Sequence, residues 1–410
     1  MRILHLSVLY PPIVLGGAER FTATLAEEQT KLGHQVGVVT LGPEAEPAYM
    51  HNGVLVHRIS HGNLFWHPDW PKYYAPLRYA HKFLASWNPI TRHRVARVLD
   101  SFQPDVVNSH CMVGFAVDCW KESSRRRIPV VHTLHDFVLF CRNASAFRNG
   151  HVCSGICLAC RVTEPKRWYS GYVTAVIGVS RDILQRHLDR GFFGHIPAER
   201  RAVICSMPPI AIKTRSARPA GSPFTIGFIG RIIPEKGLEV LLEAVKRLPR
   251  WGWQLIIAGR VSPPLSEEAL RARSAGLPVQ WLGFVQAEEF YPQIDVLVVP
   301  SIWAEPAPLV IHEAFANAVP VVGSKIGGIA DLIEQDRTGW LCSAGDIAAL
   351  AETLIERIRA GRDALPPETA FSRFRSETTP ERVVEHYETV YRSAIDAVRK
   401  SRQRRGRTDI

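Results

Sequence analysis

The strongest constraint on the fold comes from Ile294–Ile333, where short apolar runs alternate with helix-like segments. Ile294–Pro300 and Val319–Val322 are apolar and short, as expected for strands buried on both faces of a parallel sheet. A loop and a helical pattern follow each run. Pro308 is predicted at the first position of one helix, and Gly327-Gly328 in the turn before the other. The stretch therefore predicts two helix N-termini beyond the carboxyl ends of two strands, where anions bind.

The same alternation runs through the whole chain and predicts an α/β fold with parallel sheets. Strands are expected at Arg2–Val8, Gln35–Thr40, Asp105–Asn108, Val130–Thr133, Ala175–Val179, Phe224–Ile229, Gln254–Ala258 and Val279–Trp281. Helices are expected at Ala18–Leu32, Arg92–Phe102, Arg181–Leu188 (capped by Ser180) and Leu238–Leu248.

The 410 residues are too many for one ordinary core. We expect two doubly wound, Rossmann-like domains, 1–212 and 224–379, that face each other across a cleft. Residues 213–223 (KTRSARPAGSP) have the composition of a linker. A last helix at 380–397 is predicted to cross back to the first domain, and 398–410 is predicted to be a mobile basic tail.

Composition narrows the class of protein. The chain is 46% hydrophobic and 22% charged, which is typical of a soluble globular protein. No run approaches the roughly 20 apolar residues that span a bilayer, and the start MRILHLSVLYPP does not resemble a signal peptide. We therefore expect a cytoplasmic protein whose eight cysteines are reduced.

The net charge of +11 allows two interpretations. One is attraction to an anionic membrane surface or to nucleic acid. The other is a basic tail alone, since Arg399–Arg407 contains six cations. No nucleic-acid module is recognisable, so no nucleic-acid partner is expected. The aromatic, basic segment His61–Pro89 predicts either an amphipathic surface for lipid or an acceptor, which would place the protein on the inner face of the membrane, or helices that bury their aromatic rings.

Two glycine-containing loops could hold phosphate. Arg231 and Lys236 share the loop after strand Phe224–Ile229, and two cations with exposed backbone N–H groups suit a diphosphate. Solvated surface cations are the alternative. The loop lacks the G-x-x-x-x-G-K-[ST] pattern of a Walker motif. Gly16 and Gly17 precede the first helix, where the backbone could approach a phosphate or simply form a turn.

Two carboxylates and one histidine are the candidates for chemistry. Glu305 and Glu313 are separated by seven residues and would lie at one end of the predicted sheet. The alternative is one helix-capping acid and one surface acid. His135 follows the strand Val130–Thr133 in the first domain, and a packed core histidine is its alternative role.

Four cysteines lie within 20 residues, in the pattern C-x11-C-x3-C-x2-C. Their number suits a tetrahedral thiolate site, although the first gap is not a standard finger spacing. A structural zinc or an iron–sulfur cluster that braces the His135 loop is one hypothesis, and unligated thiols are the other. The four residues are Cys141, Cys153, Cys157 and Cys160.

Three of these patterns occur together: Gly16-Gly17, G-R-x4-K-G at 230–237, and E-x7-E at 305–313 followed by Gly327-Gly328. This combination resembles the retaining glycosyltransferases of family 4, glycosyl transferases group 1, over most of the chain and most closely from Phe224 to Asp346. The resemblance implies the two-domain GT-B fold and a nucleotide-sugar donor. It makes 1–212 the acceptor-side domain and 224–379 the nucleotide-sugar-binding domain.

The resemblance also implies residue roles. Arg231 and Lys236 would hold the donor diphosphate, and Glu313 would accept hydrogen bonds from the ribose. Glu305 would lie beside the transferred sugar and either position it or stabilise its charge. His135 resembles the histidine that reaches this sugar in the family. The remaining donor contacts would be Gly16 and Gly17 from the first domain and the backbone N–H groups of Ala307 and Leu309.

The chemistry of sugar transfer agrees with this set. An oxocarbenium-like state forms while negative charge grows on the leaving diphosphate. The sequence has no Asp-x-Asp metal motif, and Arg231, Lys236 and the helix ends can supply preorganised positive charge instead. No catalytic metal is therefore expected.

The expected function is metal-independent transfer of a hexose, with retention, from a UDP- or GDP-sugar to a lipid-linked or polysaccharide acceptor of the cell surface. A nucleotide-sugar epimerase of the same architecture and a catalytically silent nucleotide-sugar-binding scaffold are the alternatives. The turn Gly259-Arg260-Val261 departs from the Gly-x-Gly usual in the family and keeps the silent alternative open.

Overall fold

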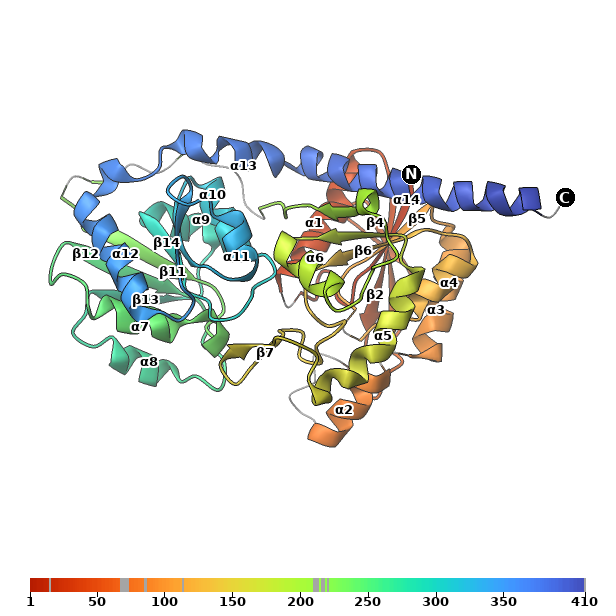
Figure 1. Ribbon diagram of the computed structural model, residues 1–410, viewed down its shortest axis with the longest axis horizontal. Helices are drawn as coiled ribbons and strands as arrows, with labels where there is room; N and C mark the ends of the chain where they lie inside the picture. Colours follow the sequence, from red (N-terminus) through yellow and green to blue (C-terminus); the bar gives the residue numbers. More distant parts are fainter. Residues whose placement is uncertain are drawn as a thin grey trace. The chain divides into compact units, whose positions relative to one another are not determined.

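The structure is a computed structural model in which the chain divides into two compact units (Figure 1). It describes residues 1–410 except 15, 67–73, 85–86, 113, 209–213, 215–217, 220 and 409–410. Unit 1 comprises Met1–Ala146, Cys153–Cys205 and Pro380–Ile410, and unit 2 comprises Phe147–Val152 and Ser206–Thr379. Five of the eleven residues of the predicted linker, 213, 215–217 and 220, lie outside the described residues.

Unit 1 is built on an eight-stranded sheet in the order β10-β9-β6-β5-β1-β2-β4-β3. Its strands are β1 (Arg2–Leu6), β2 (Gln35–Gly42), β3 (Tyr49–His51), β4 (Val54–Ser60), β5 (Val106–Ser109), β6 (Val130–Leu134), β9 (Ala175–Gly178) and β10 (Arg201–Val203). All neighbours are parallel except β3 and β4. Strands β3, β4 and β10 were not predicted. The strand order reverses between the neighbouring strands β1 and β5, which is a topological switch point.

Helices cover both faces of this sheet. The helices of unit 1 are α1 (Gly17–Lys31), α2 (Ala75–Leu84), α3 (Pro89–Phe102), α4 (Cys119–Arg125), α5 (Glu164–Tyr169), α6 (Arg181–Leu188) and α14 (Pro380–Thr408). Neighbouring residues of β5 show the two faces, because Asn108 bonds to Tyr391 of α14 whereas Ser109 bonds to Trp120 of α4. Ser180 caps α6 as predicted, by accepting from a backbone N–H of the first turn.

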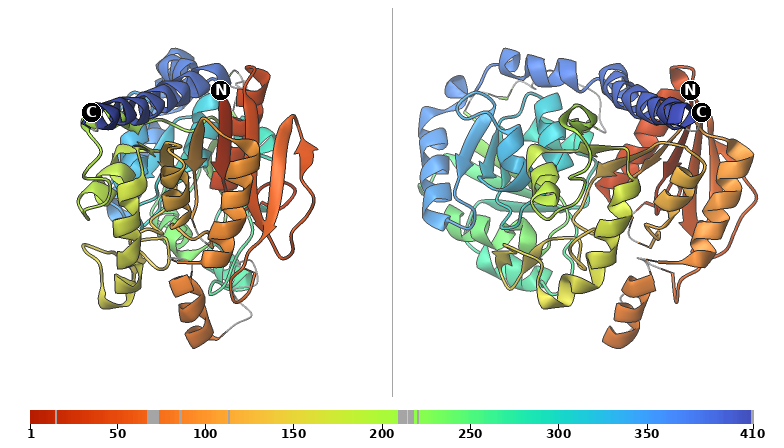
Figure 2. Two further views of the ribbon diagram at one scale, coloured as in Figure 1. Left: turned by 90° about the vertical axis from the view of Figure 1, so that its right-hand side faces the viewer. Right: turned by 45° about the vertical axis from the view of Figure 1, so that its right-hand side comes forward.

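The C-terminal helix α14 packs against α1, β5, β6 and β9, so it belongs to unit 1 (Figure 2). The predicted end at residue 397 was wrong, because α14 continues to Thr408. The apolar periodicity stops near Ala397, but the residues beyond are mostly Arg, Lys, Ser and Gln, which tolerate a helix well. Loss of the apolar face marks where packing ends rather than where the helix ends.

Unit 2 contains a six-stranded, fully parallel sheet in the order β13-β12-β11-β14-β15-β16. Its strands are β11 (Phe224–Ile229), β12 (Trp253–Ala258), β13 (Val279–Gly283), β14 (Val296–Val299), β15 (Val321–Ser324) and β16 (Gly339–Cys342). Its helices are α7 (Leu238–Val245), α8 (Glu267–Arg273), α9 (Ala287–Phe290), α10 (Leu309–Ala316), α11 (Gly327–Leu332), α12 (Ile347–Ala360) and α13 (Ser372–Glu377). A short hairpin, β7 (Phe147–Arg148) with β8 (His151–Val152), groups with this unit.

Apart from its edge strand β13, the sheet of unit 2 is buried on both faces, as its continuous apolar strands predicted. Leu255 and Ile257 of β12 pack into a cluster with α7 and α12, whereas Ile256 and Ala258 pack into a second cluster with α10 and α11. Two helix starts differ slightly from prediction. Pro308 is the residue before α10, not its first residue, and Gly327-Gly328 opens α11 rather than forming a separate turn.

No helix in the described part of the chain is both long enough and apolar enough to cross a membrane.

Candidate active site

The predicted donor residues of unit 2 meet where its strand order reverses. Strands β11 and β14 are neighbours, so the loops that follow them share the carboxyl edge of the sheet. Gly237 allows these loops to touch. Its φ is +70°, and a Cβ there would lie 2.0 Å from the carbonyl oxygen of Pro300. Only glycine fits at this contact.

An ion pair joins the two loops. Lys236 Nζ lies 2.5 Å from Glu305 Oε2, and the hydroxyl of Ser301 donates to Oε1 of the same carboxylate. Glu305 is 3% exposed, so both of its oxygens are held in a largely dry environment. The structure therefore brings together two predicted residues that are 69 positions apart. Ser301 was missed by the sequence analysis, although it directly follows a predicted strand.

Arg231 differs from Lys236 in its contacts. It is exposed at the carboxyl edge of β11 and makes no hydrogen bond or ion pair with any residue in the described part of the chain. Ala307 precedes α10 and Leu309 is its first residue, where N–H groups lack intrahelical acceptors. A free guanidinium and a helix N-terminus thus lie on the two loops that Lys236 and Glu305 connect.

The glycine pair at the start of α11 packs directly against the backbone of the Glu305 loop. A Cβ on Gly327 would lie 2.7 Å from the carbonyl oxygen of Glu305, and one on Gly328 would lie 1.9 Å from that of Pro306. The N–H of Gly328 donates to the Glu305 carbonyl at 2.7 Å. The predicted glycine pair therefore acts through close backbone packing that places Glu305.

Glu313 lies on α10 and is 8% exposed. The hydroxyl of Tyr291 donates to its Oε2 at 2.8 Å. Burial, together with the Glu313 charge, raises the pKa of Tyr291 well above its usual value, so the phenol keeps the proton that it donates. Tyr291 belongs to a short 3-10 turn after α9, and no sequence signal marked it as a partner.

In unit 1, His135 follows β6 and is partly exposed. Its Nε2 lies 3.0 Å from Nδ1 of His110, and its ring packs beside Phe21. Burial lowers the pKa of His135 to about 3, so its imidazole is neutral at physiological pH. The next residue, Asp136, accepts from the N–H of Val138 at 2.8 Å.

Gly16 and Gly17 lie where predicted, at the N-terminus of α1, with Gly16 as its cap and Gly17 as its first residue. The backbone of Gly16 is extended, with φ −151° and ψ −171°, so its conformation does not itself require glycine. Glu19, three residues after Gly16, was missed as a candidate. One of its buried oxygens has no hydrogen-bond partner among the described residues, and burial raises its pKa.

The four cysteines carry no disulfide. A hydrogen bond from the Cys160 thiol lowers the pKa of Cys141 to about 6, and hydrogen bonds from backbone N–H groups contribute less to the same shift. The thiol of Cys160 also forms a hydrogen bond with that of Cys157. Within the described ranges, however, no three His, Cys, Asp or Glu side chains are arranged to hold a metal. The cysteines as placed do not fit a complete ligand set, and the metal hypothesis stays a prediction for metal analysis of the protein and a Cys157→Ser variant.

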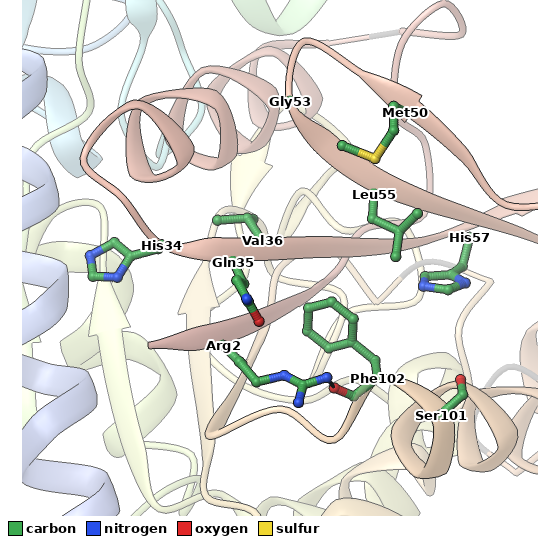
Figure 3. Close-up of a pocket in the computed structure, with 10 residues that line it drawn as sticks. All are labelled: Arg2, His34, Gln35, Val36, Met50, Gly53, Leu55, His57, Ser101 and Phe102. Carbon is green, nitrogen blue, oxygen red and sulfur yellow. Dashed lines mark hydrogen bonds between the residues drawn. The ribbon is translucent and has the colours of Figure 1, made fainter.

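Unit 1 also contains a cavity of about 520 Å³ (Figure 3). Its lining includes Arg2 and Gln35, the first residues of β1 and β2, and Phe102 at the end of α3. It therefore opens at the amino ends of the strands, whereas His135 follows the carboxyl end of β6. None of the predicted site residues lines it.

Comparison with known proteins agrees with this geometry. Residues 223–359 match the family described as Glycosyl transferases group 1, and residues 15–206 match Glycosyltransferase Family 4. A protein of the cps region of Klebsiella pneumoniae is 25% identical over 336 residues, which are 81% of this chain and 87% of that protein. Glycogen synthase of Mycobacterium tuberculosis is 27% identical over 377 residues, covering 86% and 84%.

Solved structures show the same fold. Sucrose-phosphate synthase from Thermosynechococcus elongatus superposes with a TM-score of 0.73 at 20% identity, over 97% of this chain and 99% of that one. HepE from Anabaena, in complex with UDP, superposes with a TM-score of 0.68 at 18% identity, over 96% and 100%. Together, the family matches and the two Rossmann-like sheets show that the chain belongs to the family 4 glycosyltransferases and has their GT-B fold.

Proposed function

We propose that this glycosyltransferase moves a hexose from a UDP- or GDP-sugar, with retention of anomeric configuration, to a cell-surface polysaccharide or glycolipid. The Lys236–Glu305 pair at the switch point of unit 2 carries the proposal. It places a cation and a buried carboxylate on adjoining loops, and Arg231 lies exposed on the same loop as Lys236. A leaving diphosphate needs the cations, and a sugar with oxocarbenium character needs the carboxylate.

Each residue then has a role that follows from its contacts. Arg231 and Lys236 bind the diphosphate, and the first N–H groups of α10 add positive charge. Glu313, oriented by Tyr291, accepts hydrogen bonds from the ribose. Glu305, held by Ser301 and Lys236, stabilises positive charge on the transferred sugar.

The identity of donor and acceptor draws support from the relatives. HepE has been solved with UDP and with UDP-glucose, which favours a uridine nucleotide. The Klebsiella relative belongs to a cps region, and an amylovoran biosynthesis glycosyltransferase of Erwinia amylovora is 32% identical over 156 residues, or 35% of this chain. Both support a role in polysaccharide assembly.

A peripheral position on the inner face of an anionic membrane is part of this proposal. Around α2, Tyr74, Phe83 and Trp87 expose 70%, 54% and 49% of their surface, whereas Phe65 is buried. Trp66 is half-buried, with its ring centroid 5.8 Å from that of His61, and the side chains of Trp70, Tyr73 and Tyr79 lie outside what the structure describes. Exposed rings beside basic residues suit a lipid interface. Binding to anionic vesicles that a double Phe83→Ala, Trp87→Ala change abolishes would support this position; equal binding by the variant would refute it.

Nucleotide release from a panel of UDP- and GDP-sugars tests the reaction itself. We expect slow release with one donor and loss of at least about 100-fold in Lys236→Ala and Glu313→Ala. Lys246→Ala is the matched control, because Lys246 also pairs with a glutamate, 2.8 Å away, but on the exposed surface of unit 2. Release that survives Lys236→Ala would overturn the site assignment.

The products separate the remaining alternatives. A retaining enzyme releases the α-anomer first from UDP-α-glucose, which proton NMR detects before mutarotation. Conversion of one nucleotide sugar into another, without release of nucleotide, would indicate an epimerase. Tight binding of the whole panel without turnover would indicate a silent scaffold.

A further inference from the structure

A row of buried polar side chains in unit 1 ends at His135. Six residues form it behind His135, and each is at most 1% exposed: His5, Gln29, Asn108, His110, Thr133 and Tyr391. They come from β1, α1, β5, the loop after β5, β6 and α14. Six polar groups in the centre of a core are costly unless every one is paired. Their pairing is therefore a specific feature of this unit.

The three imidazoles are linked end to end. Nε2 of His135 lies 3.0 Å from Nδ1 of His110, and Nε2 of His110 lies 2.9 Å from Nδ1 of His5. Consecutive rings have centroids 5.2 and 5.3 Å apart. At the far end, Nε2 of His5 lies 2.8 Å from Oε1 of Gln29.

Neutral rings in such a row must share one tautomer. Burial lowers the pKa of His5 to about 4 and that of His110 well below its usual value, so both are neutral like His135. A neutral imidazole has one N–H and one lone pair. When His5 donates from Nε2, its Nδ1 can only accept, so His110 must donate from Nε2, and His135 likewise. The tautomer of His5 at one end of the row therefore determines the tautomer of His135 at the other end.

Gln29 sets the direction at the buried end. Its Oε1 accepts from His5, while its Nε2 donates to the hydroxyl of Tyr391 on α14. That hydroxyl also accepts from Nδ2 of Asn108 at 2.7 Å, and Oδ1 of Asn108 accepts from Thr133. The C-terminal helix thus orients the amide that faces His5.

At the other end, Nδ1 of His135 makes no hydrogen bond to any residue that the structure describes, and the ring is partly exposed. With His135 donating from Nε2, this nitrogen carries a lone pair.

We propose that His5 and His110 are positioning residues that hold His135 in its Nε2–H form, so that Nδ1 accepts a hydrogen bond from a hydroxyl of the bound ligand. That this ligand is a sugar rests on the proposed function. The arrangement selects a hydroxyl that can donate. A fluorine or a methoxy group at the same position leaves the lone pair of His135 without a proton to accept.

The tautomer can be observed directly in the full chain without any ligand. Long-range proton–nitrogen NMR of protein labelled with ¹⁵N-histidine distinguishes Nε2–H from Nδ1–H rings, and His135→Gln assigns the signal. We expect His135 in the Nε2–H form. His110→Phe keeps a ring but removes both nitrogens, and Nδ1–H should then become populated at His135.

Substitutions at Gln29 test the direction of the row. Gln29→Glu keeps an oxygen acceptor and should preserve the Nε2–H form, whereas Gln29→Met should release it. His151→Gln, on the hairpin of unit 2, is the control and should leave the His135 signal unchanged. If His110→Phe does not fold, the comparison of Gln29→Glu with Gln29→Met still tests whether the row sets the tautomer of His135.

A His135 ring in the Nδ1–H form, or one whose tautomer ignores both Gln29→Met and His110→Phe, would overturn the proposal. This outcome is distinct from failure of the proposed function. The enzyme could release nucleotide with a His135 tautomer opposite to ours, which refutes only the positioning role. The predicted tautomer without any nucleotide release would refute only the proposed function.

Discussion

Gly328→Ala is a demanding test of how the active-site loop is placed, because Gly328 has no functional group of its own. A Cβ at this position would lie 1.9 Å from the carbonyl oxygen of Pro306. Real Cβ contacts essentially never fall below 3.0 Å, so the Glu305–Pro306 backbone must withdraw by about 1.1 Å. The N–H of Gly328 also bonds to the Glu305 carbonyl, so this carboxylate moves with the loop.

A shift of this size should be expensive for catalysis. Misplacement of a catalytic group by about 1 Å can cost about 100-fold in rate, or about 2.7 kcal/mol of transition-state stabilisation. We therefore expect kcat/KM for nucleotide release to fall by about 100-fold in Gly328→Ala. Overpacking should also lower the free energy of unfolding by about 1–3 kcal/mol, measured by urea denaturation.

Gly276→Ala is the matched control in unit 2. Gly276 has a φ of +77°, and a Cβ there would meet nothing within 4 Å. Backbone strain should destabilise this variant by about 1–2 kcal/mol without moving the Glu305 loop. The reasoning fails if Gly328→Ala keeps its activity within about threefold, or if Gly276→Ala loses as much activity at equal stability.

Three further predictions follow from buried polar contacts. Tyr291→Phe removes the donor that orients Glu313, so the Kd for UDP measured by calorimetry should rise about tenfold; an unchanged Kd would contradict the assigned role. Arg362 donates two hydrogen bonds, at 2.7 and 3.0 Å, to the carboxylate of Asp295, which is 3% exposed. Arg362→Ala should therefore lower the free energy of unfolding by about 2–3 kcal/mol, and Arg362→Lys should restore only part of that loss. An unchanged free energy of unfolding in Arg362→Ala would contradict a stabilising role for the pair. Stability should be full above pH 7 and decrease as the pH falls below 6.5, because burial lowers the folded-state pKa of five histidines to about 3–4 and the unfolded chain binds protons first. Free energies of unfolding at pH 7 and 5, measured by urea denaturation, should differ by about 2 kcal/mol for each of these histidines, and equal values would refute it. These histidines are His5, His132, His135, His187 and His312.

Much of the fold was predictable because a strand that is buried on both faces has a continuous apolar sequence, which is visible over a few residues. Strand β11 and helix α6 were predicted at their observed bounds, since an apolar run or a capping serine is visible within a few residues. Strands β3 and β4 were missed because their sequences, such as VLVHRIS, mix apolar and basic residues. In β4, the buried Arg58 finds acceptors in Glu46 and Tyr49, which lie outside the strand.

The chemical character of the candidate site was also visible in the sequence. Lys236 and Glu305 could be named because each lies on a loop just beyond a predicted strand, where parallel sheets expose functional groups. Glu313 could be named because it completes the E-x7-E pattern of the family that the sequence resembles. What each residue contacts could not be named. Lys236 was assigned to a diphosphate alone, whereas the structure also pairs it with Glu305.

The sequence by itself therefore determined the α/β class, the two domains and the loops that carry the chemistry, because these depend on interactions between near neighbours. Only the tertiary structure decided that β14 lies beside β11, which joins Lys236 to Glu305 across 69 residues. It also decided that His5 and His110, 105 residues apart, form one row behind His135. Such contacts depend on strand order, and strand order is set by how the whole sheet packs rather than by any local pattern.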